Sequence, residues 1–225
     1  MIFDLIRNGL SLELVINLCV RVFIIFCVLP IHEFAHGFVA YKLGDNTARL
    51  KGRLTMNPLA HIDPFGALMV ILVGFGYAKP VPVNIGNFKR GKRKQYMALT
   101  AFAGPVSNLI MATVFTFVYC FIYYKLLGTN ESIYYVALFC SVAAQINVSL
   151  AVFNLLPIPP LDGFHLLNDT ILKGRLQLDG QLFRITQVIL IVLMLSGTLN
   201  TVLFAANEFV GSALVRTIMM IGGQL

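Results

Sequence analysis

Two histidines and a glutamate near the N-terminus have the spacing of a metal-binding motif. His32, Glu33 and His36 form the pattern H-E-x-x-H. On a helix, residues four apart share a face, so both imidazoles can bind one metal ion. Glu33 lies about 100° around the helix axis from His32, beside the metal without ligating it. This is the position of a general base that takes a proton from water.

A catalytic zinc ion needs a third protein ligand and an open fourth position. The available candidates are His61, Asp63, Asp162 and His165. Asp162 follows the run P-I-P-P-L, whose prolines prevent a continuous helix. Such backbone is tolerated in a membrane only where it packs in protein or lines a wet cavity. Spacing favours Asp162 and leaves His165 and His61 open. His61 and Asp63, in a proline-bracketed turn, are expected to be structural.

The elements that position these residues must be embedded in lipid. Hydrophobic residues make up 58% of the chain and charged residues 12%, whereas soluble domains have about 45–50% and about 25%. The mean hydropathy is +0.81. A chain of this size cannot bury so much apolar surface in water. The four cysteines lie in apolar runs and are expected to be small buried hydrophobes.

Long apolar segments predict the membrane-spanning helices. They cover about residues 12–43, 95–127, 133–156 and 182–204, and a shorter stretch covers 209–221. Residues 65–77 are too few to span and predict a re-entrant or interfacial element. Residues 49–56 and 80–85 alternate between polar and apolar, which predicts strands that could receive an unwound substrate.

The predicted fold is therefore an all-α integral membrane protein. It is a polytopic helical bundle with a small re-entrant, β-containing element on the cytoplasmic side. We expect one membrane-embedded domain over residues 1–225, with a core of about 12–165 and C-terminal helices at about 182–221.

Charge predicts the orientation. Ten of the seventeen lysines and arginines lie between Lys42 and Lys94, and basic loops remain in the cytoplasm. We therefore expect a multi-pass protein of the cell membrane, with its active site toward the cytoplasm. No aromatic-rich RNA-reading motif accompanies the basic residues, so no nucleic-acid partner is expected. No small-residue cleavage site follows the first apolar run, so no cleavable signal peptide is expected.

Three motifs in order carry a family resemblance: H-E-x-x-H at His32–His36, G-P-V-S-N at Gly104–Asn108, and L-D-G at Leu161–Gly163. With them the chain resembles the site-2 proteases, intramembrane zinc peptidases. The stretch N-P-L-A-H-I-D-P at residues 57–64 looks like the short branch of the family, which lacks a PDZ domain. The resemblance implies one zinc ion held by His32, His36 and Asp162, with Glu33 as the base.

Three further residues are candidates beside this set. Gly104 and Asn108 are one helical turn apart on one face, and Gly104 allows a close approach of two helices. As a hypothesis, Asn108 donates to the oxyanion of the scissile carbonyl; the alternative is a polar residue bonded across helices. Gly104 and Asn154 are candidates for binding the substrate, Asn154 by holding its backbone.

Two other functions are alternatives to an intramembrane zinc peptidase. A prenyl-protein type of H-E-x-x-H protease would need a late glutamate ligand, and Glu208, the only one, has no metal-binding motif around it. A metal transporter or membrane scaffold without protease activity is the other alternative. The expected partners are the lipid bilayer, a membrane-spanning protein substrate, and a regulatory membrane protein or a second copy.

Overall fold

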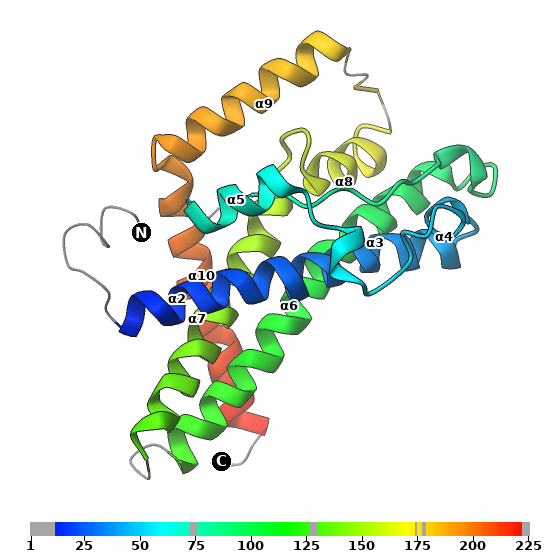
Figure 1. The fold of residues 1–225 in the computed structure, drawn as a ribbon. Helices are drawn as coiled ribbons and strands as arrows, with labels where there is room; N and C mark the ends of the chain where they lie inside the picture. Colours follow the sequence, from blue (N-terminus) through cyan, green and yellow to red (C-terminus); the bar gives the residue numbers. More distant parts are fainter. Residues whose placement is uncertain (1–11, 73–75, 127–129, 174, 177–178, 222–225) are drawn as a thin grey trace.

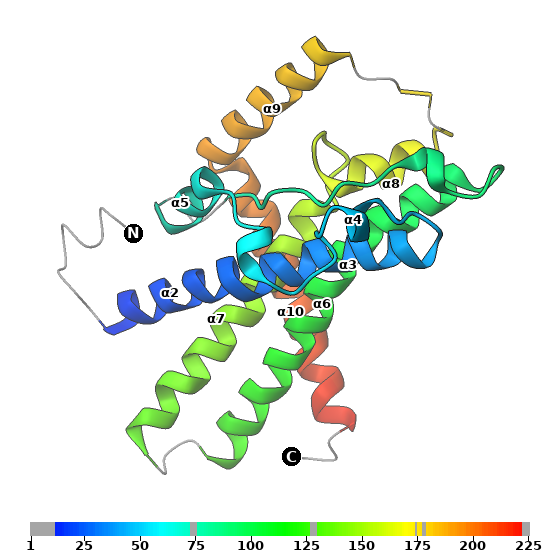
Figure 2. The ribbon, with the colours of Figure 1, turned by 45° about the vertical axis from the view of Figure 1, so that its right-hand side comes forward.

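The computed structural model describes residues 12–72, 76–126, 130–173, 175–176 and 179–221. These residues form helices and connecting segments, and no strand occurs among them. Figure 1 shows a bundle in which α6 and α7 lie side by side, α2 and α3 cross them, and α10 lies behind. The turned view in Figure 2 shows the same arrangement.

Four helices are long and apolar enough to cross a membrane, at Leu14–Lys42, Arg93–Lys125, Glu131–Asn154 and Thr198–Met220. The membrane-spanning helices predicted at about residues 12–43, 95–127 and 133–156 correspond to the first three of these four helices. The core beside the first crossing combines Ile16, Val20, Ile24 and Val28 with Ala143 of the third.

The first crossing is interrupted by a wide turn. Helix α2 (Leu12–Phe23) continues through a π-helical segment (Ile24–Val28) into α3 (Leu29–Lys42). In this segment the amide of Leu29 donates to the carbonyl of Ile24, five residues back. Pro30 follows directly, and proline has no amide hydrogen and crowds the preceding turn. The extra residue in the turn rotates the α3 face that carries the histidines relative to α2.

Helix α6 (Arg93–Lys125) and helix α7 (Glu131–Asn154) run antiparallel as a hairpin. Asn130 caps α7 by accepting from the amide of Ser132. After α7 the chain passes through a proline-rich segment into the short helix α8 (Asp162–Thr170).

The predicted fourth crossing was misplaced. Helix α9 (Gly180–Leu195) is followed by its C-cap residue Ser196, and α10 (Thr198–Ile221) begins after Gly197. Gly197 has φ +75°, a left-handed conformation that ends helices and favours glycine. The chain therefore turns inside the apolar run 182–204, and the fourth candidate crossing is Thr198–Met220. Helix α9 is shorter and stands away from the bundle except at its C-terminal end (Figures 1 and 2).

The predicted β-containing element was wrong for the described residues. Residues 47–50 form the short helix α4 (Thr47–Leu50), and a turn at Gly52, φ +66°, follows it. In residues 80–85 the prolines cannot donate, and the amides of Val81 and Asn84 donate to the carboxylates of Glu33 and Asp45. Alternation in sequence was not sufficient, because no strand partner supplies a ladder. The hypothesis that these residues form a strand that receives an unwound substrate is dropped together with this element.

The short apolar stretch after residue 64 is helical where it is described. Helix α5 (Pro64–Leu72) is too short to span a bilayer. Arg21 of α2 donates to the carbonyls of Val70 and Ile71, at 2.8 and 3.4 Å. A cation at the C-terminal end of a helix satisfies free carbonyls and complements the helix dipole. Arg21 therefore fixes α5 against the first crossing.

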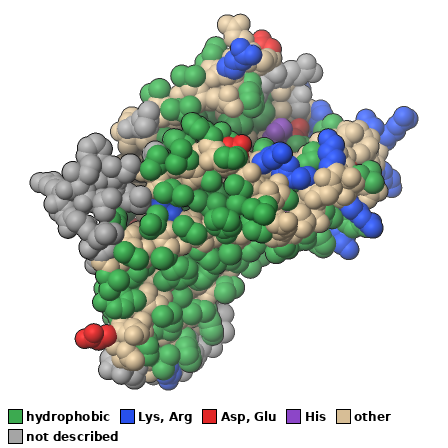
Figure 3. Space-filling model, in the orientation of Figure 1, with side chains coloured by type: hydrophobic (Ala, Val, Ile, Leu, Met, Phe, Trp, Pro, Cys, Tyr) green, Lys and Arg blue, Asp and Glu red, His purple; other side chains and the backbone are tan. Residues whose placement is uncertain are grey.

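Charge and apolar surface are separated on the molecule. Figure 3 shows lysines and arginines gathered at the end that carries α4 and the beginning of α6, whereas the face of α2, α6 and α7 is largely hydrophobic. This division fits a protein that has one end in water and a body that faces lipid.

Candidate metal centre

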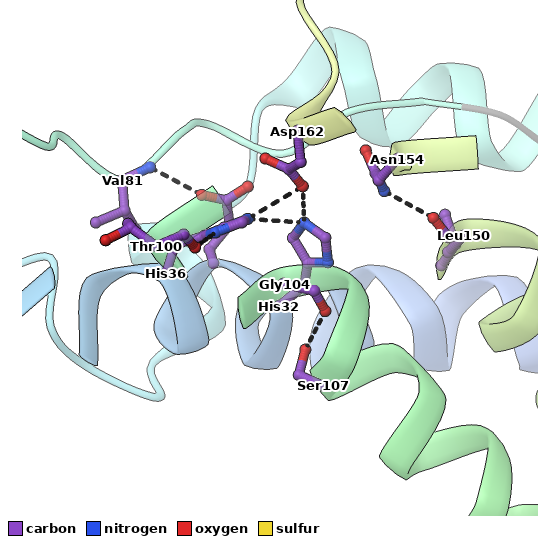
Figure 4. Close-up of polar contacts among 10 residues, drawn as sticks. His32, His36, Val81, Thr100, Gly104, Ser107, Leu150, Asn154 and Asp162 are labelled. Atoms are coloured by element: carbon purple, nitrogen blue, oxygen red, sulfur yellow. Dashed lines mark hydrogen bonds and ion pairs between the residues drawn. The ribbon is translucent and has the colours of Figure 1, made fainter. Parts of the chain in front are cut away.

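Three metal-ligating side chains converge where α3, α6 and the start of α8 meet. The Nε2 atoms of His32 and His36 are 3.1 Å apart, and Asp162 Oδ2 lies 3.3 Å from each of them. Figure 4 shows Asp162 pointing from α8 at both imidazoles. Tetrahedral N and O ligands about 2.0–2.1 Å from zinc lie about 3.3–3.4 Å from one another. The triangle therefore has the dimensions of one face of a zinc site.

Hydrogen bonding fixes which nitrogen of His36 faces the cluster. Nδ1 of His36 lies 2.7 Å from the carbonyl oxygen of Thr100 on α6, which can only accept. In the neutral ring the proton is therefore on Nδ1 and the lone pair of Nε2 points at Asp162. Asp162 Oδ2 is itself buried without a hydrogen-bond partner among the described residues. Acceptors that converge in this way need a proton or a cation between them, so these residues can hold a metal ion.

Gly104 makes room for both imidazoles. A Cβ at this position would lie 2.3 Å from His36 Nε2 and 2.5 Å from His32 Cε1. Both rings therefore lie directly on the backbone of α6 (Figure 4). Gly104 allows the close approach of helices that was predicted, and its nearest neighbours are the candidate ligands His32 and His36.

Asp162 is the first residue of α8, and its position depends on the segment before it. A Cβ at Gly163 would lie 2.1 Å from the carbonyl oxygen of Leu155, so glycine lets the start of α8 pack against the end of α7. Burial raises the pKa of the Asp162 carboxyl, but contacts with His32 and His36 outweigh it and hold the pKa below its usual value.

Glu33 is held by the segment that replaces the predicted strand. The amide of Val81 donates to Glu33 Oε2 at 2.8 Å. Val81 lies between Pro80 and Pro82, so its amide is the only backbone donor among these three residues. The bond holds one oxygen of the Glu33 carboxylate in place.

Asn108 and Asn154 differ in the hydrogen bonds that their side chains form. Asn108 is 1% exposed, and neither side-chain atom has a hydrogen-bond partner among the described residues. A direct bond across helices, the alternative for this residue, is therefore not formed there. Asn154 donates to the carbonyl of Leu150 at 2.9 Å and lies near Asp162 (Figure 4).

The other candidate ligands have separate roles. His61 is buried, and its Nε2 lies 2.8 Å from the carbonyl oxygen of Thr55. Asp63 accepts from the amide of Gly66 in the first turn of α5. His165 lies 3.7 Å from Asp169, one turn further along α8. None of these side chains belongs to the cluster of His32, His36 and Asp162.

Sequence reasoning missed two partners of the site, Thr100 and Val81. Thr100 acts through its backbone carbonyl, so its residue type gives no signal. Val81 could have been found, because an isolated amide between two prolines is a donor that must find its acceptor outside a strand ladder.

Comparison with known proteins finds relatives that are named as zinc metalloproteases. The family model "Peptidase family M50" matches residues 124–197, which include Asp162. "Putative zinc metalloprotease YwhC" of Bacillus subtilis is 43% identical over 64% of this chain and 65% of its own length. "Putative zinc metalloprotease Rip2" of Mycolicibacterium smegmatis is 30% identical over 60% of this chain and 51% of its own. The chain thus spans about half to two thirds of these relatives.

No solved structure matches this chain. The family model matches the segment that contains Asp162, and each of the two relatives matches more than half of this chain. The chain is therefore similar to peptidase family M50 over residues 124–197 and to bacterial proteins named putative zinc metalloproteases.

Proposed function

We propose that the protein is an intramembrane zinc endopeptidase. The observation that carries the proposal is the convergence of His32, His36 and Asp162 on one point, with Glu33 next to His32 in sequence. A bound zinc ion supplies Lewis-acid polarisation of a carbonyl and acidifies water. The relatives' names and the family support the same metal and reaction class.

In this proposal the residues of the chain have distinct tasks. His32, His36 and Asp162 hold the metal, and the Thr100 carbonyl orients His36. Glu33 takes a proton from the attacking water and delivers it to the amine of the leaving peptide. Asn108 donates to the oxyanion, and Asn154 binds the substrate backbone.

The substrate is a membrane-spanning protein. His32 and His36 lie within the crossing Leu14–Lys42, about 9–15 Å below Lys42 at 1.5 Å per residue. Peptide bonds at this depth belong to segments inserted in the bilayer. A substrate helix must unwind locally first, because its carbonyls are hydrogen-bonded internally. The basic residues between Lys42 and Lys94 support a site that opens toward the cytoplasm.

The test compares purified wild type with Glu33→Gln, on zinc content and on cleavage of a transmembrane test peptide. The wild type should hold about one zinc and cleave, whereas Glu33→Gln should keep zinc and lose activity by a factor of about 100 or more. His165→Gln is the matched control and should behave as wild type. Absence of zinc from gently extracted wild type would contradict the proposal and favour a transporter or scaffold.

A further inference from the structure

A polar cavity lies inside the bundle, away from the metal centre. It has a volume of about 350 Å³ between α6, α7 and α10. Its polar lining comprises Thr116, Tyr119, Ser141, Gln145, Asn207, Glu208 and Ser212. Thr116 is three turns along α6 from Gly104, about 18 Å at 1.5 Å per residue. The cavity is therefore separate from the proposed catalytic site.

Several polar groups of the lining can only accept from a ligand, because their hydrogens are already donated within the bundle, whereas the Tyr119 hydroxyl can also donate. Thr116 and Ser212 donate their hydroxyl hydrogens to carbonyls of their own helices. The amide nitrogen of Asn207 donates to Ser149 Oγ at 2.7 Å, while its Oδ1 is buried without a partner among the described residues. Glu208 adds a carboxylate that forms no ion pair within the described part of the chain. Such a site selects a cationic hydrogen-bond donor.

Glu208 lies at the middle of its helix. Within the crossing Thr198–Met220 it is about 15 Å from one end and about 18 Å from the other. Glu208 and Gln145 are exposed at the mouth of the cavity. Polar groups that face lipid at this depth are costly, and a carboxylate there marks a functional site unless it is paired. Lipid headgroups lie too far away to provide the partner.

A second copy of this chain does not supply the missing charge. A two-fold axis along the membrane normal keeps each residue at its own depth, so only a basic residue near the depth of Glu208 could pair with it. Arg21 of the first crossing already donates to the carbonyls of Val70 and Ile71. Arg216, the only basic residue in this crossing, lies about 12 Å away along the helix. The cation must therefore come from a different protein.

We propose that this cavity binds a transmembrane helix of a partner protein that presents a lysine or arginine at mid-membrane depth to Glu208. The cost of a buried cation in the partner and that of Glu208 offset each other when the two pair. Asn207 and Gln145 complete the acceptor set around the cation. This interaction is independent of the metal and of the proposed cleavage.

The test measures association of a designed partner helix with the full chain in lipid vesicles. The probe is a fluorescent leucine-alanine transmembrane peptide with one central lysine, compared with the same peptide carrying leucine there. Energy transfer to labelled wild type should show tighter binding of the lysine peptide, by about threefold to thirtyfold. Glu208→Gln should abolish this preference. Glu131→Gln, a matched change of an exposed carboxylate outside the cavity, should retain it.

Two further measurements locate the interaction. A photoreactive residue beside the lysine should cross-link to residues of α7 and α10 around Glu208, and Glu208→Lys should reverse the preference toward a peptide with a central glutamate. The proposal is overturned if the lysine and leucine peptides bind equally or if cross-links fall outside α6, α7 and α10.

Discussion

The backbone of Gly104 lies against Nε2 of His36, so closely that a methyl group at residue 104 would be 2.3 Å from that nitrogen. Real Cβ atoms essentially never approach a heavy atom so closely. The position of the imidazole therefore depends on the absence of a side chain on the neighbouring helix.

Gly104→Ala should displace both imidazoles and weaken zinc binding by about 10- to 100-fold, the usual effect of disturbing the groups that orient metal ligands. Zinc content and competition with a chelator measure this. Gly211→Ala is the control, because a Cβ there meets nothing within 4 Å. Wild-type zinc affinity in Gly104→Ala would show that the rings do not depend on this contact.

Val81→Pro removes the amide that donates to Glu33 Oε2. The loss of one hydrogen bond to a charged group, about 1.5–3 kcal/mol, should lower kcat by about tenfold or more with zinc content unchanged. Val83→Pro stiffens the same segment without removing a hydrogen bond observed in the structure, and it should retain activity. Equal losses in both variants would assign the effect to the backbone rather than to Glu33.

Asn108→Leu keeps the approximate volume of a buried side chain and removes both of its polar atoms. If Asn108 donates to the oxyanion, kcat should fall by about 100- to 1,000-fold while zinc content stays normal. Cleavage kinetics on the transmembrane test peptide, with parallel zinc analysis, measure this. Unchanged turnover at normal zinc content would exclude the oxyanion role.

Asp45 joins the end of α3 to the segment that holds Glu33. Burial raises the pKa of its carboxyl, but hydrogen bonds from Thr47, Asn84 and Asn87 outweigh this and lower the pKa. The stability that the Asp45 carboxylate contributes is therefore fully present above about pH 3.9, the pKa of an aspartate in the unfolded chain. It is lost as the pH falls through the lower pKa of Asp45 in the folded protein. Asp45→Ala should cost about 3 kcal/mol at pH 7, and less below about pH 4.

Thermal unfolding in detergent from pH 7 to pH 3 measures the effect of Asp45→Ala. Glu131→Gln, an exposed carboxylate at the start of α7, provides the reference and should change little. A stability difference between wild type and Asp45→Ala that did not vary with pH would show that packing, not the carboxylate, accounts for it.

The sequence predicted the parts of this molecule that depend on local spacing. H-E-x-x-H places His32 and His36 on one face of any helix, and the prolines before Asp162 indicated an irregular segment. The first three crossings follow from long apolar runs. The third ligand was left open by spacing alone, because the meeting of α8 with α3 is a property of the whole fold.

The remaining features depend on tertiary structure. Residues 80–85 alternate like a strand, yet their free amides bind Glu33 and Asp45, which are distant in sequence. The break at Gly197 divides a continuous apolar run, and hydropathy is insensitive to one glycine. Arg21 binds carbonyls of α5, and a single cation in an apolar run does not indicate in sequence which partner it will find.

The distribution of the three proposed metal ligands over the chain also affects biogenesis. His32 and His36 enter the membrane with the first helix, whereas Asp162 follows only after the α6–α7 hairpin. During synthesis the chain therefore holds two of its three ligands, beside Glu33, without a complete site. If the proposed site is correct, a chain that ends before α8 lacks Asp162, so peptidase activity can arise only after α8 has been made.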